Sequence, residues 1–154
     1  MYSLIVRRNI RNAFAQINKG NYAAIVKQFG PNAEHVFYGE HALAGSRFTH
    51  AGIARWYKRL PAAFPNLRFD LKKIVVNGWP WDTTVAVEWV DHFSMGDGAR
   101  GSNQGVHVFG IRWGKVVSLH IYCDTEKLMG YLERLAEQGV EEARAPAIDE
   151  ARPA

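Results

Sequence analysis

The chain has 154 residues, of which 47% are hydrophobic, and this suits one globular domain with its own core. Its net charge of +4 includes no basic run of the kind that follows phosphates, so we expect no nucleic-acid partner. No apolar stretch is long enough for a signal peptide or a membrane span, and Cys123 is the only cysteine. We therefore expect a cytoplasmic protein with no intrachain disulfide and no membrane partner.

The amino-terminal part of the chain predicts helices. Residues 3–19 form the first, because apolar side chains recur at spacings of three and four: Val6, Ile10, Phe14 and Ile17. Residues 22–29 predict a second, short helix after Gly20 and Asn21. A short strand over 35–38 and a loop over 39–47 follow.

A third helix is expected to begin at Thr49, whose hydroxyl can cap it, and to end at Pro61 and Pro65. From residue 67 onward the pattern becomes that of strands. Four strands are predicted, over 68–77, 83–94, 104–113 and 115–124. In the first of them the apolar phase slips between Leu71 and Ile74, which indicates a bulge.

The last helix is predicted over 126–138, capped by Thr125 or Asp124. Helices that precede a series of antiparallel strands indicate an α+β domain over residues 1–138, with helices covering one face of a strongly curved sheet. Residues 139–154 are a polar tail that we expect to be mobile.

Asp91 lies where an apolar residue is expected. Alternation along the strand 83–94 places Asp91 on the same face as Val87 and Trp89, and this is the core face. A buried carboxylate costs several kcal/mol unless it is paired, hydrogen-bonded or protonated. Asp91 is therefore either a satisfied structural group or an acid or base in the wall of a cavity.

His107 shares this interior face in every register that the hairpin 95–101 allows. With the turn centred on residue 99, Asp91 and His107 are directly opposite; centred on 98, they are diagonal neighbours; centred on 97, Asp91 faces Asn103 instead. A carboxylate beside an imidazole suits proton transfer, and it also suits a pair that merely satisfies itself.

The opposite face of the sheet is too apolar to be fully solvated. It carries Val106, Val108, His120 and Tyr122, and through these residues we expect a homodimer. No histidine or cysteine spacing resembles a metal site and no phosphate-binding loop is present, so neither a metal nor an organic cofactor is expected.

The order of elements is similar to that of the nuclear transport factor 2-like superfamily over about residues 5–135. The resemblance rests on three segments: Leu43–Arg47, Gly114–Val117 and Tyr122–Thr125. It implies a cone-shaped curved sheet packed on three helices and closed by a fourth, and it points to the SnoaL-like and ketosteroid-isomerase-like branch. This fold hosts enzymes, binders and scaffolds alike.

Within that resemblance, Asp91 looks like a catalytic aspartate of the epoxide hydrolases, whose partner arginine is replaced here by Trp89. His107 looks like the active-site histidine of SnoaL-like cyclases. Other family positions are not kept: the cyclase aspartate falls at Ile121, the isomerase base near Val36 and the isomerase tyrosine near Ala13. The usual isomerase and hydrolase sets are therefore incomplete.

The leading hypothesis is an enzyme without a cofactor that transfers protons on a small apolar or polyketide-like molecule. Asp91 and His107 are the expected catalytic residues. The expected lining of the pocket comprises Phe14, Tyr38, His41, Trp56, Trp89, Asn103, Phe109, Leu119 and Ile121. The alternative is a non-catalytic ligand-binding or dimeric scaffold domain with the same cavity.

Overall fold

A computed structural model describes residues 1–154. The elements in chain order are α1 (Tyr2–Asn18), α2 (Tyr22–Val26), β1 (Phe29–Phe37), β2 (Gly45–Arg47), α3 (His50–Ala63), β3 (Arg68–Trp79), β4 (Asp82–Ser94), β5 (Arg100–Arg112), β6 (Lys115–Cys123), α4 (Thr125–Glu137) and a short 3-10 turn (Glu141–Ala143).

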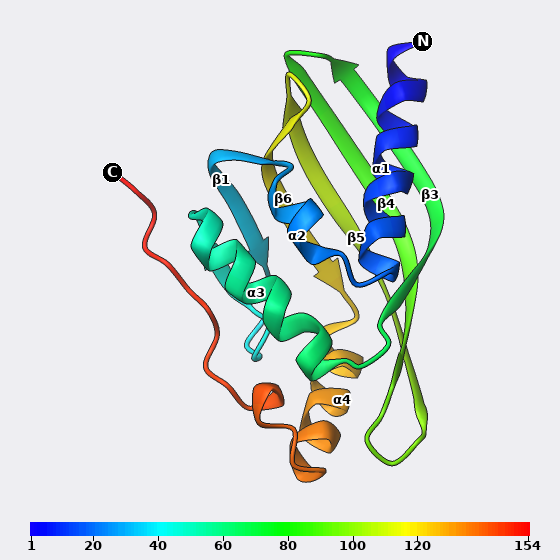
Figure 1. Cartoon of the computed structure of the whole chain (residues 1–154), viewed down its shortest axis with the longest axis vertical. Helices are drawn as coiled ribbons and strands as arrows, with labels where there is room; N and C mark the ends of the chain where they lie inside the picture. The colour runs from blue at the N-terminus through cyan, green and yellow to red at the C-terminus, as the bar shows by residue number, and fades with distance from the viewer.

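The strands form one curved sheet in the order β2-β1-β6-β5-β4-β3. All neighbours are antiparallel except β1 and β6, which are parallel. Helices α1, α2 and α3 lie on one face of the sheet, and α4 closes the end to which the β4–β5 hairpin turns (Figure 1). The predicted α+β fold, with three leading helices and one closing helix, is confirmed.

Local signals in the sequence account for most helix positions. Val6, Ile10, Phe14 and Ile17 are the buried residues of α1, as their spacing predicted. Thr49 Oγ1 accepts the backbone N–H of Gly52, which starts α3. At α4 the cap is Asp124, whose carboxylate accepts the N–H of Lys127.

The first strand was predicted too short. β1 begins at Phe29 rather than at residue 35, and α2 accordingly ends at Val26. The turn signal at Pro31 and Asn32 becomes an irregularity inside β1, where pairing with β6 shifts register between Phe29 and Glu34. Ladder hydrogen bonds to β6 therefore outweighed the local turn preference.

Two other predictions need correction. The segment 39–47 is not all loop, since β2 pairs with the end of β1. Pro61 does not end α3 but lies in its last turn, and the N–H of Phe64 still bonds to the carbonyl of Leu60. The bulge in β3 is confirmed, because its pairing with β4 shifts between Leu71 and Lys73.

The carboxy-terminal segment lies along β2 and α3 (Figure 1). The N–H of Ser46 donates to the carboxylate of Asp149, and the N–H of Glu150 donates to the carbonyl of Ser46, both at 2.7 Å. Arg47 is fully buried and donates to the carbonyl of Ile148 at 2.9 Å. Composition did not indicate these contacts; the mobility of residues 139–154 stays a prediction.

No helix in the structure combines the length and the apolar character that crossing a bilayer requires.

Candidate active site

The hairpin register separates the two predicted catalytic residues. Asp91 lies opposite Asn103, and His107 lies opposite Val87, so the turn is centred on residue 97. His107 follows the partner of Asp91 by four residue steps along β5, which is about 13 Å in an extended strand. Of the three registers that alternation left open, the structure has the one in which Asp91 faces Asn103, because the short loop Met95–Ala99 fixes the turn, so Asp91 and His107 do not form a direct pair.

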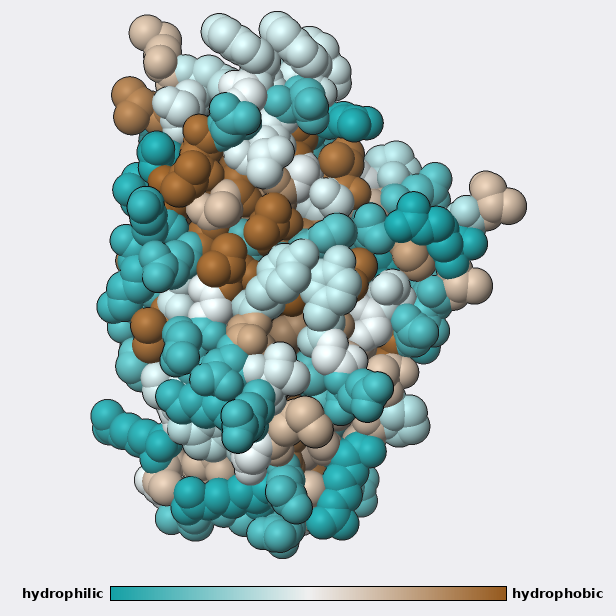
Figure 2. All heavy atoms as spheres, turned by 180° about the vertical axis from the view of Figure 1, so that it is seen from behind, coloured by the Kyte–Doolittle hydropathy of each residue, from teal (hydrophilic) through white to brown (hydrophobic).

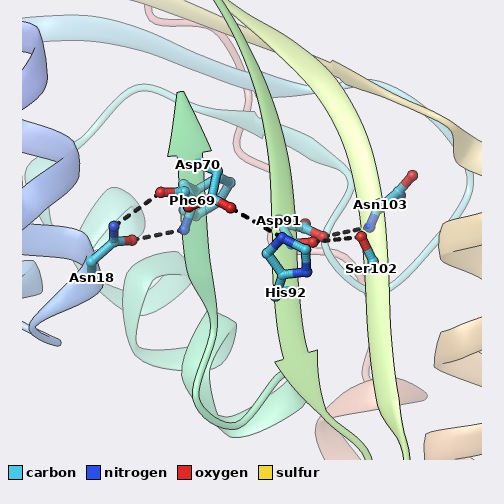
Figure 3. A network of polar contacts seen from close by, with 7 residues as sticks. All are labelled: Asn18, Phe69, Asp70, Asp91, His92, Ser102 and Asn103. Atoms are coloured by element: carbon cyan, nitrogen blue, oxygen red, sulfur yellow. Dashed lines mark hydrogen bonds and ion pairs between the residues drawn. The ribbon is translucent and has the colours of Figure 1, made fainter. Parts of the chain in front are cut away.

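Asp91 is held by the backbone of β5. Its Oδ1 accepts the N–H of Asn103 at 2.6 Å, and its own carbonyl accepts from the hydroxyl of Ser102 at 2.8 Å (Figure 3). The residue is 9% exposed, and burial raises the pKa of its carboxyl to about 6, although the Asn103 N–H opposes that rise. At neutral pH the group is thus mostly an ionised carboxylate with the strength of a general base.

The neighbouring strand is tied to α1 in the same region. The side chain of Asn18, at the end of α1, donates to the carbonyl of Phe69 and accepts its N–H, at 3.0 and 2.8 Å (Figure 3). Phe69 pairs with Asp91 across β3 and β4. The pair of bonds from Asn18 therefore fixes the aromatic wall beside the carboxylate, while Asp70 and His92 form an exposed pair at 3.2 Å on the other face.

His107 is neutral and has a defined tautomer. Trp89 Nε1 donates to His107 Nδ1 at 2.8 Å. Because an indole N–H can only donate, Nδ1 carries a lone pair and the proton lies on Nε2. Burial lowers the pKa of the imidazole to about 3, so at neutral pH His107 offers a hydrogen-bond donor rather than a base.

Trp89 reaches His107 because Gly105 leaves room for its ring. Gly105 is the β5 partner of Trp89, and a Cβ there would lie 2.6 Å from the indole and 2.2 Å from the carbonyl oxygen of Tyr122. Glycine at this position therefore permits the close approach that orients the Trp89–His107 bond.

Two hollows meet at His107. The larger, of about 390 Å³, runs along α1 beside the ends of β5 and β6. The smaller, of about 40 Å³, contains Asp91 in its wall. Three residues line both: Ile17, Tyr57 and His107. The first volume suits a small organic ligand, whereas the second has the size for water.

The structure brings most of the predicted lining residues to these hollows. Phe14 and Phe109 line the larger one. Trp56, Trp89, Asn103 and Ile121 line the smaller one with Asp91.

Three predicted lining residues lie elsewhere. Tyr38 is 46% exposed and stacks on Tyr122 on the outer face of the sheet, since it follows the last residue of β1. The imidazole of His41 folds back onto the carbonyl of Tyr38 and the ring of Phe37. Leu119 is 1% exposed and is sealed in the core, lining neither hollow.

Tyr57 is a candidate site residue that the sequence did not single out. Its side chain is buried and lines both hollows, yet its hydroxyl has no hydrogen-bond partner within the protein and is not sealed from the cavity. Burial also raises the pKa of the phenol, so the hydroxyl stays protonated. A buried tyrosine hydroxyl without a partner is unusual, and it is available as a donor to a ligand. The sequence signal was a tyrosine on the apolar face of α3, which core packing explains equally well.

Residues near the opening of the larger cavity were also not anticipated. Asn9, Asn12 and Gln28 are exposed where they line it, so they mark its polar rim. Cys123 borders the smaller hollow, where burial raises the pKa of its thiol to about 12 and keeps it protonated. Nowhere in the chain do three histidine, cysteine, aspartate or glutamate side chains gather closely enough to bind a metal ion.

Solved structures with the same fold share little sequence with this chain. A structure of TerC co-crystallised with polyporic acid has 20% identity and a TM-score of 0.67, covering 82% of this chain and 95% of TerC. An NTF2-like protein of unknown function from Burkholderia pseudomallei has 12% identity and a TM-score of 0.72, covering 81% and 95%. IdmH from Streptomyces antibioticus, a proposed polyketide cyclase, has 15% identity and a TM-score of 0.66, covering 82% and 97%. At these identities the likeness is one of fold.

Among curated proteins, no sequence matches this chain. The SnoaL-like domain model matches residues 10–119, which includes α3, the whole of β4 and β5, and both Asp91 and His107. The chain therefore belongs to the SnoaL-like domain family.

Proposed function

We propose that this SnoaL-like protein transfers a proton on a small, conjugated, polyketide-like carbonyl compound that enters the larger cavity and extends past His107 into the smaller hollow to reach Asp91. The observation that carries the proposal is the pair of interior groups whose pKa values are displaced in opposite directions. Burial raises the pKa of Asp91 to about 6 and lowers that of His107 to about 3. Such a pair offers an ionised base and a neutral donor at the same pH.

In this mechanism the Asp91 carboxylate takes a proton from carbon and becomes a carboxylic acid. The electrons of the broken C–H bond move through the conjugated system to the carbonyl oxygen, which becomes an enolate oxygen. That oxygen accepts hydrogen bonds from His107 Nε2–H and from the hydroxyl of Tyr57, which have no protein acceptor. Return of the proton to a different carbon would complete an isomerisation or accompany ring closure.

The separation of Asp91 and His107 selects the kind of substrate. Along the strand direction about 13 Å separates Asp91 from His107, which is too far for both groups to act on adjacent atoms. A six-membered ring with its carbonyl oxygen, together with a contact of roughly 3 Å to each group, spans most of this distance. The substrate we propose therefore carries its acidic C–H and its carbonyl on opposite sides of a ring.

Neighbours of the same fold support the substrate class. TerC was co-crystallised with polyporic acid, and IdmH is a proposed polyketide cyclase. The larger cavity is lined mainly by apolar residues of α1 and the sheet, which suits a ligand of this kind.

A non-catalytic carrier is the second candidate, and one observation favours it. The hollow at Asp91 holds only about 40 Å³, which is water-sized, and the carboxylate already has a backbone partner in Asn103. In that case a ligand would occupy the larger cavity without reaching Asp91, and the carboxylate would be structural.

Proton exchange of anthrone separates the two candidates, since its acidic CH₂ group lies across the central ring from its carbonyl. In buffered D₂O without oxygen, we expect the protein to accelerate deuterium uptake at that carbon about a hundredfold over buffer, as followed by NMR.

Tyr57→Phe should reduce this rate about tenfold by removing one donor to the enolate oxygen. Tyr22→Phe is the matched control, because Tyr22 stacks on Tyr57 but lines neither hollow. Anthrone that binds and quenches tryptophan fluorescence without faster exchange would identify a carrier.

We also propose a homodimer through the outer face of the sheet. Val106, Val108 and His120 are half-buried there and Tyr122 is 47% exposed. Apolar side chains gather over this face of the molecule in the view from behind (Figure 2).

Light scattering tests the dimer. The wild-type protein is expected at twice the 17.4 kDa of one chain, and Val108→Glu is expected at 17.4 kDa, because a buried carboxylate opposes association. Met129→Glu, on the exposed side of α4, is the control and should remain dimeric. A wild-type mass of one chain at high concentration would contradict the proposal.

A further inference from the structure

Three tryptophans are exposed together at the end of the molecule that is opposite α4. Trp79 ends β3, Trp81 lies in the β3–β4 turn and Trp113 in the β5–β6 turn; they are 64%, 55% and 73% exposed. The rings of Trp79 and Trp81 stack at 6.0 Å and 10°, and Trp113 lies 6.2 Å from Trp81. The N–H of Trp113 donates to the carbonyl of Pro80 at 2.6 Å, which joins the two turns.

The first turn of α1 extends this exposed surface. Leu4 is 67% exposed and Ile5 53%. The hydroxyl of Tyr2 hydrogen-bonds to Thr83 Oγ1 at 2.5 Å, and Thr83 donates to the carbonyl of Trp79. The start of α1 and the two turns therefore lie at one end of the molecule, uppermost in Figure 1. We call Leu4, Ile5, Trp79, Trp81 and Trp113 the aromatic tip.

Cationic side chains border the aromatic tip. Arg8, Arg112 and Lys115 are exposed on α1 and on the β5–β6 hairpin, and the one carboxylate beside the tryptophans is that of Asp82. None of these three cations forms an ion pair in the structure. Exposed indole rings with unpaired cations beside them match the interface of a bilayer that contains anionic lipids.

We propose that the aromatic tip binds an anionic lipid surface. Indole rings settle at the headgroup level, because their apolar body leaves water while the N–H keeps a polar partner. Leu4 and Ile5 add apolar area, and Arg8, Arg112 and Lys115 supply attraction to the headgroups. The sequence led us to expect no membrane partner because no segment could span a bilayer; binding at the surface needs no such segment.

The larger cavity opens next to the aromatic tip, so lipid binding through the tip would affect how a ligand enters the cavity. Tyr2 and Ile5 of the first turn of α1 line the cavity, as do Ile111 and Gly114 of the β5–β6 hairpin. A molecule seated on lipid through the aromatic tip would hold the cavity opening at the lipid boundary. An apolar ligand could then pass between bilayer and cavity with little exposure to water.

Flotation with lipid vesicles tests the proposal without any substrate, so its outcome is separate from that of the anthrone assay. We expect the wild-type protein to float with vesicles of phosphatidylcholine containing about 30% phosphatidylglycerol, and about tenfold less with phosphatidylcholine alone. The triple variant Trp79→Ser, Trp81→Ser and Trp113→Asn should lose binding at least tenfold. Asparagine is chosen for Trp113 because that residue has a φ of 49°, which asparagine tolerates.

Two further variants define the contact. Arg112→Ser with Lys115→Ser should remove the preference for phosphatidylglycerol, while Met129→Ser, which removes an exposed apolar side chain on α4, should bind as the wild type does. Absence of wild-type flotation would overturn the proposal, and so would retained flotation of the triple variant. If the triple variant instead halves the mass seen by light scattering, the tip contacts a second copy of the chain and the lipid proposal fails.

Discussion

Replacing Asp91 by asparagine should abolish proton exchange and at the same time stabilise the protein. Loss of the base is expected to return anthrone exchange to the rate in buffer, a drop of about a hundredfold, while ligand affinity changes by no more than a few fold. The stabilisation follows from burial, which moves the pKa of this carboxyl from 3.8 to about 6 and so disfavours its ionised form in the folded chain by about 3 kcal/mol. Asparagine keeps an oxygen that can accept the N–H of Asn103.

The raised pKa of Asp91 makes the stability gained in Asp91→Asn depend on pH. Well below pH 3.8 the carboxyl is protonated in both folded and unfolded chains, so ionisation carries no cost. Between pH 4 and 6 the unfolded chain ionises first and the folded wild type loses stability; above pH 6 the loss is complete. Urea unfolding should therefore show Asp91→Asn more stable than the wild type by up to about 3 kcal/mol at pH 8, with a difference that shrinks toward pH 4.

Asp70→Asn is the matched control for this experiment. Asp70 lies on the neighbouring strand, exposed and paired with His92, so its replacement should change neither exchange nor stability appreciably. An Asp91→Asn protein that is less stable than the wild type at pH 8 would show that the carboxylate is a satisfied structural group. Retained exchange in that variant would remove Asp91 from the mechanism.

Replacing Arg47 by methionine should cause the largest loss of stability. Arg47 is fully buried and donates to three carbonyls, those of Ala44, Gly45 and Ile148. It also donates to Nδ1 of His35 at 3.1 Å and packs over the ring of Trp56. Methionine would fill much of the space but leave these four acceptors without a donor, at an expected cost of about 4 kcal/mol in the free energy of unfolding.

Urea unfolding at pH 7 measures this loss, with Arg144→Met as the control because Arg144 is exposed and makes no side-chain hydrogen bond. The Arg47→Met protein should also be cleaved faster by protease within residues 144–152, since the carbonyl of Ile148 no longer has its anchor. If Arg47→Met lowers the free energy of unfolding by less than about 1 kcal/mol and leaves cleavage unchanged, water satisfies the acceptors that lose the guanidinium.

The surroundings of Asp91 and His107 explain why the pKa values of the two groups are displaced in opposite directions. Burial lowers the pKa of His107, whose Nδ1 accepts the N–H of the neutral Trp89. Asp91 has a backbone N–H that favours its charged form and thus keeps its pKa from rising further. The same interior therefore keeps one group neutral and the other mostly charged at pH 7.

The sequence by itself determined the fold class and the interior position of Asp91 and His107. Side chains alternate with a period of two along a strand, so the content of each face shows which one is buried, whatever the register. The spacing of Val6, Ile10, Phe14 and Ile17 likewise determined the buried face of α1.

Only the tertiary structure decided how these residues meet. A register shift by an even number of residues leaves the same side chains on the interior face. Alternation therefore could not choose between a direct Asp91–His107 pair and the observed pairing of Asp91 with Asn103. Nor could it show that Tyr57 has a hydroxyl without a partner, or that Arg47 meets the carbonyl of Ile148, which is 101 residues away in sequence. Such contacts depend on which segments pack together, and long-range packing is not encoded in any local periodicity.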